Sequence, residues 1–182
     1  MIKAIVFDLG GVLYHAVFND IAIFQKFIKE WDKVKTGGMT DEEFYEIIAN
    51  ETNTTPKKIR EKFLAGIEID EDMRNLVIAL KQNYKIGILT NTIEDLYEAD
   101  KTIWNFEEIA EVITSFNEHV AKPSQEAMDL MLKKLGVKKE EIIFIDDHQD
   151  TIKRYSELGI TCIKFTGYKN LLNKLQKMEI QI

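Results

Sequence analysis

The sequence predicts an α/β fold, in which a doubly wound parallel sheet carries a small all-α insertion. Short apolar runs rich in β-branched residues recur along the chain, and each is too short to be a helix. From about residue 84 onward these runs alternate with helical patterns, an order typical of parallel sheets. Between about residues 16 and 82 the chain instead shows helix signals without a convincing strand.

Five runs are expected to form the strands of the sheet. The clearest cover residues 4–7, 86–89 and 142–145, and two weaker candidates cover residues 112–116 and 161–165. Helices cover both faces of a parallel sheet, so its strands are expected to be apolar throughout rather than alternating.

Four helical patterns lie between or after these strands. They cover residues 93–104, 125–135, 151–158 and 171–178. The second stops at Gly136 and the third at Gly159, and glycine is the residue most often found just past a helix end.

The inserted segment carries the start signals of about four helices. Thr40 and Glu43 form a capping-box pattern, and Thr55 precedes Pro56 at a first helical position. Asp70 precedes the apolar stripe Met73, Leu76, Val77 and Leu80, and an earlier stripe consists of Ile21, Phe24, Phe27, Ile28 and Trp31.

We expect hinges near residues 13–16 and 81–84. These divide the chain into an α/β core of residues 1–15 and 83–182 and a helical cap of residues 16–82 over the ligand-binding edge of the sheet. The cap is rich in aromatic residues, most of which we expect to pack inside it: Phe18, Phe24, Phe27, Trp31, Phe44, Tyr45 and Phe63.

Composition excludes several classes of protein. The 182 residues are 45% hydrophobic with only 9 Gly and 2 Pro, which suits a packed domain and not a disordered chain. The net charge of -7 disfavours nucleic acid and anionic membranes as partners. No apolar stretch is long enough for a signal peptide or a membrane span, and Cys162 is the only cysteine. We therefore expect a soluble, cytoplasmic protein.

Polar residues follow the predicted strands at the points where they end. Asp8 follows the first strand, Thr90 and Asn91 follow the second, and Asp146 and Asp147 follow the third. Each could be no more than a turn or a helix cap. However, the carboxyl ends of parallel strands share one edge, where ligands bind. We expect these residues to converge in one crevice, together with Lys122 from the loop before residues 125–135.

Electrostatics then favours a cation at this edge. If Asp8 and Asp147 lie ~4 Å apart, their repulsion is about 4 kcal/mol at an effective dielectric constant of 20. Lys122 supplies one positive charge, and Mg²⁺, which prefers oxygen ligands, would supply more. A dianionic phosphoryl group could then approach, with Thr90 as a hydroxyl donor and Asp8 as an in-line nucleophile.

The ordered set of motifs resembles that of the haloacid dehalogenase-like hydrolase superfamily. The matching segments are residues 7–13 (Phe-Asp-Leu-Gly-Gly-Val-Leu), 88–91 (Ile-Leu-Thr-Asn), 122–123 (Lys-Pro) and 144–147 (Phe-Ile-Asp-Asp). The resemblance covers residues 1–15 and about 84–166, and it implies a Rossmann-like core. The insertion is similar to the small cap that this superfamily places after the first motif.

The resemblance also implies roles for these residues. Asp8 would attack phosphorus to form an aspartyl-phosphate that water then hydrolyses. Thr90, Asn91 and Lys122 would hold the transferring group, and Lys122 would also orient Asp8.

The same resemblance implies a metal site. Asp147 would bind Mg²⁺ directly with Asp146 beside it. Asp8 and the carbonyl oxygen of Gly10 would be further ligands.

The sequence departs from the superfamily pattern at Gly10, where phosphatases usually carry a second Asp as general acid and base. Losing such a group costs roughly 10² to 10⁴ in rate, so we expect slow turnover or a restriction to good leaving groups. Water, a cap residue or His15 could supply the proton, although His15 also fits an exposed hinge position.

A second departure lies after the acidic pair. Thr151 stands where members often have Asn or Asp. Asp150 could assist the outer shell of the metal or cap the next helix. His119 and His148 are expected to be loop residues without a catalytic role.

The function expected from these observations is Mg²⁺-dependent hydrolysis of a small phosphorylated metabolite. The alternative from another class is a non-catalytic protein that binds or senses a phosphorylated ligand. A 2-haloacid dehalogenase would have no use for the acidic pair, and a receiver domain would carry that pair after its first strand. A nicotinamide-binding domain is disfavoured because the first turn lacks the Gly-x-Gly-x-x-Gly spacing.

Overall fold

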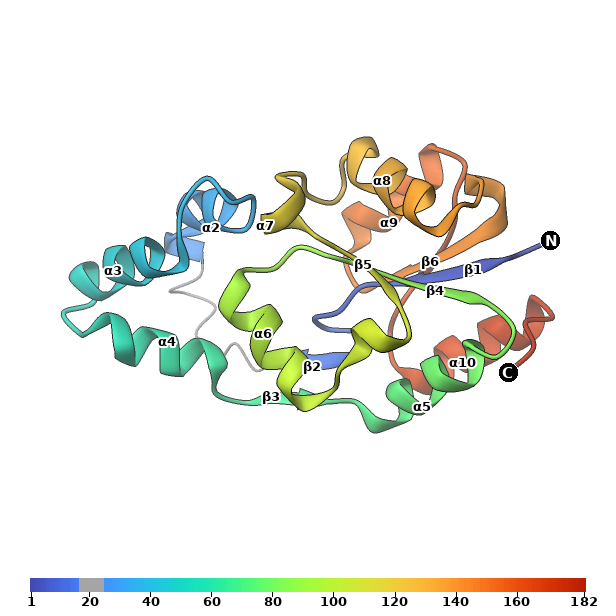
Figure 1. Ribbon diagram of the computed structural model, residues 1–182, viewed down its shortest axis with the longest axis horizontal. Coiled ribbons are helices and arrows are strands. Elements are labelled where there is room, and N and C mark those ends of the chain that lie inside the picture. Colours follow the sequence, from blue (N-terminus) through green and yellow to red (C-terminus); the bar gives the residue numbers. More distant parts are fainter. Residues whose placement is uncertain (17–24) are drawn as a thin grey trace.

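The computed structural model describes residues 1–16 and 25–182. Its centre is a five-stranded sheet with the strand order β5-β4-β1-β6-β7 (Figure 1). The strands are β1 (Ala4–Phe7), β4 (Lys85–Thr90), β5 (Glu111–Thr114), β6 (Ile142–Asp146) and β7 (Thr161–Lys164). All four pairings are parallel, which confirms the predicted doubly wound sheet.

The register brings the ends of the three central strands together. Phe7, the last residue of β1, pairs with Ile88 of β4 on one side and with Ile145 of β6 on the other. The residues that follow β1 therefore lie between the ends of its two neighbours. This is the sheet edge at which sequence reasoning places the polar residues.

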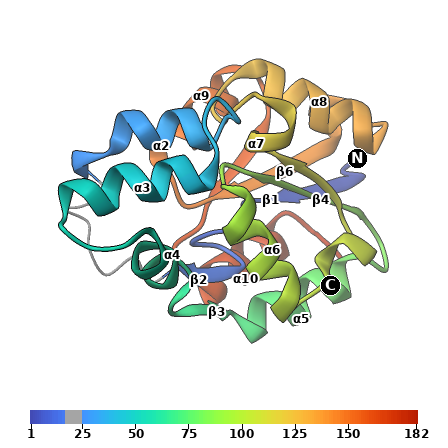
Figure 2. The same cartoon turned by 60° about the vertical axis from the view of Figure 1, so that its left-hand side comes forward.

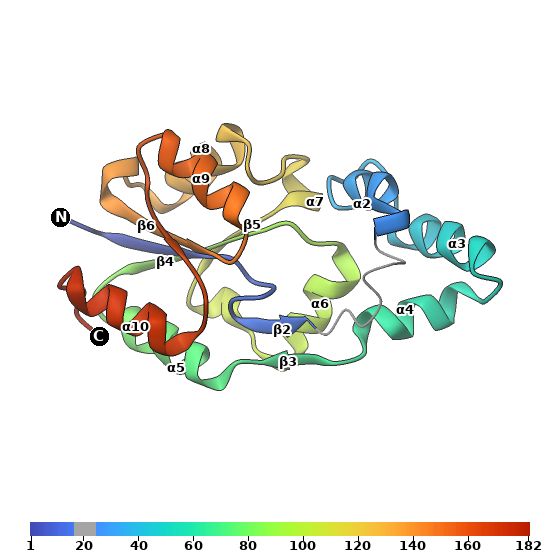
Figure 3. The ribbon, with the colours of Figure 1, turned by 180° about the vertical axis from the view of Figure 1, so that it is seen from behind.

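Helices cover both faces of the sheet (Figures 1 and 3). On one face Ala4 and Val6 pack with α8 (Gln125–Leu135) and α9 (Gln149–Glu157). On the other face Ile5 and Phe7 pack with α5 (Glu71–Leu80), α6 (Glu94–Ile103) and α10 (Tyr168–Lys177). The alternation along β1 follows from the two-residue period of a strand.

The inserted helices form a separate apolar cluster beyond the carboxyl edge of the sheet (Figure 2). They are α2 (Ile28–Val34), α3 (Asp41–Glu51) and α4 (Pro56–Leu64). Among the predicted aromatics, Phe27, Phe44, Tyr45 and Phe63 are buried in this cluster, and Trp31 packs against it. The predicted residues Phe18, Ile21 and Phe24 lie outside the described part of the chain.

The predicted helix starts are confirmed by their hydrogen bonds. Thr40 and Glu43 form the full capping box, since the Thr40 hydroxyl accepts from the Glu43 N–H and the Glu43 carboxylate accepts from the Thr40 N–H. Thr55 and Asp70 also accept hydrogen bonds from the first turns of α4 and α5. These side chains satisfy N–H groups that have no partner within the helix.

The expectation that the inserted segment contains no strand is wrong. β3 (Ile67–Ile69) pairs antiparallel with β2 (Tyr14–Ala16), and this ribbon stands where we expected the first hinge. Each strand has only three residues, and local periodicity cannot identify so short a run.

The fourth helix of the inserted segment packs with the sheet. Met73, Leu76, Val77 and Leu80 of α5 belong to the same apolar cluster as Ile5 and Phe7. The division into a core of residues 1–15 and 83–182 and a cap of residues 16–82 stays a prediction. Because of this packing, we propose a smaller cap that ends before β3.

The cap helices are tied to the start of α6. Arg60 of α4 makes two hydrogen bonds to the carboxylate of Asp95, at 2.7 and 3.0 Å. Asp41 of α3 accepts a hydrogen bond from the Asp95 N–H at 2.8 Å, and Ile93 is buried in the cap cluster. These contacts hold the cap against the sheet edge.

The remaining elements are short. A four-residue helix, α7 (Ser115–Glu118), follows β5 directly, so the predicted strand at residues 112–116 ends early. Two 3-10 turns, η1 (Phe106–Glu108) and η2 (Lys139–Glu141), precede β5 and β6. Within the described residues, none of the helices combines the length and the apolar character that crossing a bilayer requires.

Candidate active site

Three carboxylates meet at the carboxyl edge of the sheet. Asp8 directly follows β1, Asp146 ends β6, and Asp147 is the next residue. One oxygen atom from each of them lies within 4.8 Å of the others. The structure thus brings Asp8 together with two acids that stand 138 and 139 positions later in the sequence.

Lys122 supplies the positive charge of this cluster. Its Nζ lies 2.7 Å from Oδ1 of Asp8 and 2.7 Å from Oδ2 of Asp146, and only 4% of its side chain is exposed. A buried charge is stable only if it is paired, and Lys122 is paired twice.

Asn91 holds the loop that carries Lys122. The Lys122 N–H donates to Oδ1 of Asn91 at 2.8 Å, and Nδ2 of Asn91 donates to the Lys122 carbonyl at 2.9 Å. The side chain of Asn91 is therefore engaged on both of its polar atoms. This reciprocal pair fixes the place from which Lys122 enters the cluster.

The pKa values of the pair reflect burial and mutual attraction. Burial raises the pKa of Asp8 from 3.8 to about 6, although Lys122 opposes this rise and Asp146 adds to it. Burial alone would lower the pKa of Lys122, but the two carboxylates outweigh it and the pKa is raised. Lys122 is consequently a cation at neutral pH.

Asp146 anchors the lysine. Its side chain is fully buried, Oδ2 accepts from Lys122, and Oδ1 accepts from the His148 N–H at 2.7 Å. Both oxygens are thus hydrogen-bonded within the protein. Asp146 is better placed to orient Lys122 than to contact a ligand.

Asp147 is the acid that has no such partner. Its Oδ1 is buried without a hydrogen bond, and the nearest basic atom, Nε2 of His148, is 3.9 Å away. A buried carboxylate oxygen without a partner is costly. Oδ1 of Asp147 is therefore available to a ligand in this cluster.

Gly11 allows Asp147 to come this close. A Cβ atom at Gly11 would lie 2.6 Å from Oδ2 of Asp147, and the φ of Gly11 is +77°, which disfavours other residues. Gly10 is different, because nothing lies within 4 Å of a Cβ built there and its φ is not positive. Only the second of the two glycines is required by packing.

The residues present fit a divalent metal ion. With all three carboxylates ionised, the acidic cluster and Lys122 carry a formal charge of -2, and the oxygen of Asp147 lacks a donor. Carboxylate and carbonyl oxygens are the ligands that Mg²⁺ prefers. Asp8, Asp147 and the carbonyl of Gly10 are the candidate ligands.

The cluster opens into a cavity of about 580 Å³ beneath the cap. Asp8, Gly10, Lys122 and Asp147 line it together with residues of α2, α4 and α6. Its size is typical of small-molecule sites. A ligand in this cavity can thus touch the acidic cluster and the cap at once.

The structure separates the two residues predicted at the end of β4, Thr90 and Asn91. Asn91 lines the cavity, whereas Thr90 is buried at the end of β4 and does not appear in the described part of the cavity wall. The register of β4 with β1 nevertheless places Thr90 beside the strand end that carries Asp8. Its role toward a phosphate stays a prediction.

Of the three histidines, His148 lies beside the three carboxylates, and the other two contact different parts of the protein. His15 lies on β2, its side chain is 60% exposed, and its Nε2 is 3.5 Å from Asp70. Nδ1 of His119 lies 2.9 Å from the carbonyl oxygen of Thr36, between the core and the cap. Among the described residues that line the cavity, His148 is the only histidine.

Asp150 neither joins the acidic cluster nor caps the next helix. It is exposed in the first turn of α9, whose N-cap is His148. The helix thus begins two residues earlier than the predicted start at residue 151, and the capping interpretation of Asp150 is wrong. Thr151 is buried and lines the cavity.

Sequence reasoning missed Asp100, a further acidic residue of the same cavity that, unlike Asp8 and Asp146, has no ion-pair partner among the described residues. Asp100 is 7% exposed, lines the cavity, and has a pKa that burial raises to about 7. Ile93, Tyr97, Asp100 and Trp104 are all buried at helical spacing on or beside α6. An acid inside an apolar stripe is a readable signal of this position.

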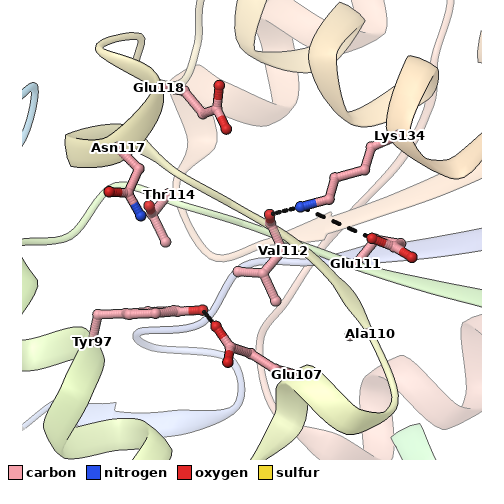
Figure 4. A pocket seen from close by; sticks show the side chains of 9 residues that line it. All are labelled: Tyr97, Glu107, Ala110, Glu111, Val112, Thr114, Asn117, Glu118 and Lys134. Carbon is pink, nitrogen blue, oxygen red and sulfur yellow. Dashed lines mark hydrogen bonds and ion pairs between the residues drawn. The ribbon is translucent and has the colours of Figure 1, made fainter.

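A smaller cleft of about 280 Å³ lies along β5 (Figure 4). Tyr97 donates a hydrogen bond to Glu107, and Lys134 donates to the Val112 carbonyl at 2.8 Å and lies 3.9 Å from Glu111. These contacts cover the exposed edge of the sheet. Within the described ranges, this cleft has no acidic trio comparable with Asp8, Asp146 and Asp147.

Comparison with known proteins agrees with this geometry. The model of the haloacid dehalogenase-like hydrolases matches residues 2–153. The sesquiterpene phosphatase astK of Aspergillus oryzae is 22% identical over 90% of this chain and 90% of its own length. The drimenol cyclase drtB of Aspergillus calidoustus is 21% identical over 91% of this chain, which spans only 34% of that longer protein.

A solved structure shows the same fold. The wild-type HAD family enzyme BT-2542 of Bacteroides thetaiotaomicron, in complex with magnesium and inorganic phosphate, has a TM-score of 0.75. It is 24% identical, and the alignment covers 90% of this chain and 94% of the other. The family match, which extends from β1 to α9, shows that this chain belongs to the haloacid dehalogenase-like hydrolases.

Proposed function

We propose that this protein is a Mg²⁺-dependent phosphatase that hydrolyses small phosphate monoesters through an aspartyl-phosphate. The observation that carries the proposal is the gathering of Asp8, Asp147 and the twice-paired Lys122 at one end of a cavity. The phosphatase astK and the phosphate complex of BT-2542 support the phosphorylated substrate class.

Asp8 is the proposed nucleophile. Its Oδ1 accepts hydrogen bonds from the Leu9 N–H and from Lys122, both at 2.7 Å, so the carboxylate is fixed in orientation. Among the described residues none donates a hydrogen bond to Oδ2. We assign Oδ2 as the attacking atom because it is the oxygen that remains free.

Lys122 and Thr90 are the proposed donors to the phosphoryl group, and Asn91 is proposed to support Lys122 beside it. The ammonium of Lys122 offsets negative charge that builds up on the phosphoryl oxygens during transfer. Asn91 keeps Lys122 in place, and the hydroxyl of Thr90 is a donor near the end of β1. Asp146 keeps Lys122 turned toward Asp8.

Asp8, Asp147 and the Gly10 carbonyl would hold the metal. When bound, Mg²⁺ would neutralise the carboxylates and polarise a phosphoryl oxygen. This removes the repulsion that a dianionic ester otherwise meets beside an acidic cluster.

The chemistry takes two displacements. In the first, Oδ2 of Asp8 forms a bond to phosphorus, the ester P–O bond breaks, and the alcohol oxygen leaves with the electron pair and takes up a proton from water. In the second, a water oxygen bonds to phosphorus and loses a proton, the P–O bond to Asp8 breaks, and the carboxylate is regenerated. Each step inverts a tetrahedral phosphorus held in one place.

Gly10 leaves the proton transfers without the usual acid. A glycine cannot protonate the leaving oxygen, so turnover should be slow or limited to alcohols that leave easily. This same feature favours the second candidate, a protein that binds a phosphorylated ligand without hydrolysing it. The two candidates differ in whether an aspartyl-phosphate forms.

The test is phosphate release from p-nitrophenyl phosphate, sugar phosphates and nucleotides with Mg²⁺. We expect wild-type activity to fall by at least roughly 10³-fold in Asp8→Asn, which removes the nucleophile and keeps the shape. Equal inactivity of both proteins would contradict the phosphatase proposal. Ligand binding by calorimetry without trapping of a beryllium fluoride mimic on Asp8 would favour the binding protein instead.

A further inference from the structure

We propose, on the basis of the phosphatase function above, that the substrate is a phosphate monoester of an apolar alcohol, with its hydrocarbon part seated against the cap. The cavity that begins at Asp8 and Lys122 continues to a wall on the cap side. At about 30 Å³ for each water-sized group, 580 Å³ holds roughly twenty such groups, far more than a phosphate alone.

The far wall of the cavity is largely apolar. It is formed by two residues of α2, the end of α4 with the residues after it, β3, and the first turns of α6. The apolar side chains concerned are Ile28, Trp31, Phe63, Ala65, Ile67 and Leu96. They come from several separate elements, so an apolar ligand in the cavity would contact more than one of them.

Ile28 is an apolar side chain of this wall that the protein leaves partly exposed. It is 44% exposed, although its neighbour in the helical stripe, Phe27, is buried in the cap cluster. Residues of the predicted stripe therefore have different roles: Phe27 packs inside the cap, whereas Ile28 faces the cavity. Each methylene of a ligand that such a side chain covers improves binding by roughly fourfold.

The polar groups on this side are already engaged with the protein. Nζ of Lys35 lies 2.6 Å from Oδ1 of Asp32, and the hydroxyl of Tyr14 donates to the Asp100 carbonyl at 2.8 Å. The hydroxyl of Thr92 donates to the Ile93 carbonyl. By contrast, the carboxyl of Asp100, which also lines the cavity, makes no hydrogen bond with the described residues.

This distribution disfavours a sugar or a nucleoside. Several hydroxyl groups would lose water on entering the cavity and would find few free partners there, and each unpaired polar group weakens binding. An alkyl group has no such cost. The structure therefore assigns selectivity to apolar contact on the cap and phosphate recognition to the sheet edge.

A homologous series of substrates tests the proposal. Phosphate release from ethyl, butyl, hexyl and octyl phosphate is measured with Mg²⁺ below the micelle-forming concentration, beside glucose 6-phosphate. We expect kcat/KM to rise with chain length, by at least tenfold from ethyl to octyl. Equal values along the series, or a preference for the sugar phosphate, would overturn the substrate class while the phosphatase function stands.

Ile28→Ser locates the effect on the cap. We expect kcat/KM for octyl phosphate to fall about three- to tenfold, whereas the value for ethyl phosphate changes less than twofold. The matched control is Ile78→Ser on α5, where the isoleucine is 41% exposed and does not line the cavity. A fall of equal size with both substrates would overturn the assignment of Ile28 to the hydrocarbon site.

Binding separates failure of this proposal from failure of the phosphatase function. Octylphosphonate and ethylphosphonate, which have no ester bond to hydrolyse, are titrated into the full chain with Mg²⁺ by calorimetry. Tighter binding of the octyl compound in a protein without phosphatase activity would support the apolar site and refute the enzyme. Equal or no binding of the two would overturn the apolar site whatever the activity.

Discussion

The two ends of the cavity differ in whether their buried acidic side chains have a charged partner in the described part of the chain. At the sheet edge, Asp8 and Asp146 share the ammonium of Lys122 at 2.7 Å each. On the wall formed by α6, Asp100 is almost as buried as Asp8 but its carboxyl has no partner. The first end is a network in which each group holds another in place, and the second is an apolar surface that includes one acid.

This difference separates chemistry from selectivity. A network of buried partners is rigid, because moving one group leaves another unpaired. The groups proposed to act on phosphate are therefore held before any ligand arrives. The apolar side chains on the cap side of the cavity make few directed bonds, so we expect this side to accept ligands of different shape and to select them by apolar area.

Removing the shared cation should have the largest effect. Lys122→Met leaves Asp8 and Asp146 buried without their common partner, and we expect the free energy of unfolding to fall by about 3 to 5 kcal/mol, with phosphatase activity lost. Urea unfolding in the presence of a chelator measures this.

Lys134→Met is the matched control for that variant. Lys134 is 43% exposed, and both its ion pair with Glu111 at 3.9 Å and its hydrogen bond to the Val112 carbonyl are open to solvent, so we expect a change below about 1 kcal/mol. If Lys122→Met were no more destabilising than Lys134→Met, the sheet edge would not be the rigid end of the cavity.

Restoring an acid at Gly10 is the second test. The open space around its Cβ position admits a side chain, and we expect Gly10→Asp to raise kcat for alkyl phosphates by about 10²-fold. Gly10→Ala should change kcat less than twofold, because alanine carries no proton.

Gly11→Asp is the control that places the same side chain one position later than Gly10→Asp. Its Cβ would clash with Asp147 at a positive φ, so we expect loss of stability and no gain in rate. A folded Gly10→Asp protein that is no faster than wild type would show that another group already supplies the proton.

For Asp100, the acid without a partner among the described residues, we expect a smaller effect on the free energy of unfolding, and one that depends on pH. The folded protein holds a proton on Asp100 up to about pH 7, whereas the ordinary pKa is 3.8, so the unfolded chain releases it earlier. The contribution of Asp100 to the free energy of unfolding is therefore greatest below pH 3.8 and is lost as the pH rises from there through 7. We expect Asp100→Asn to gain about 2 kcal/mol relative to wild type between pH 5 and pH 7.

Urea unfolding at several pH values measures that gain. Asp72→Asn, at an exposed position on α5, is the control and should follow wild type at each pH. A constant difference between Asp100→Asn and wild type across this range would show that Asp100 is ionised in the folded protein.

Local patterns sufficed for the sheet and for most of the acidic cluster. The strands that precede Asp8 and Asp146 are continuous apolar runs, and parallel pairing brings their ends together whatever lies between them. The capping box of α3 was equally readable, since Thr40 and Glu43 stand three positions apart.

Other features depend on residues that are distant in the sequence. β3 forms because Ile67–Ile69 pairs with β2, which lies more than fifty residues earlier in the chain. A run of three residues is too short to show a periodic pattern in the sequence. The packing of α5 under the sheet and the exposure of Ile28 follow from how the elements pack together. The partner of each carboxylate also depends on distances that spacing along the chain does not determine.

By itself, the amino-acid sequence determined the parallel sheet, the order of its motifs and the acids at its edge, because each of these depends on residues that are close together along the chain. The tertiary structure decided which acid holds Lys122, which glycine must stay a glycine, and which apolar side chains face the cavity. These depend on contacts between elements far apart in the chain, where a few ångströms separate an ion pair from an unpaired charge.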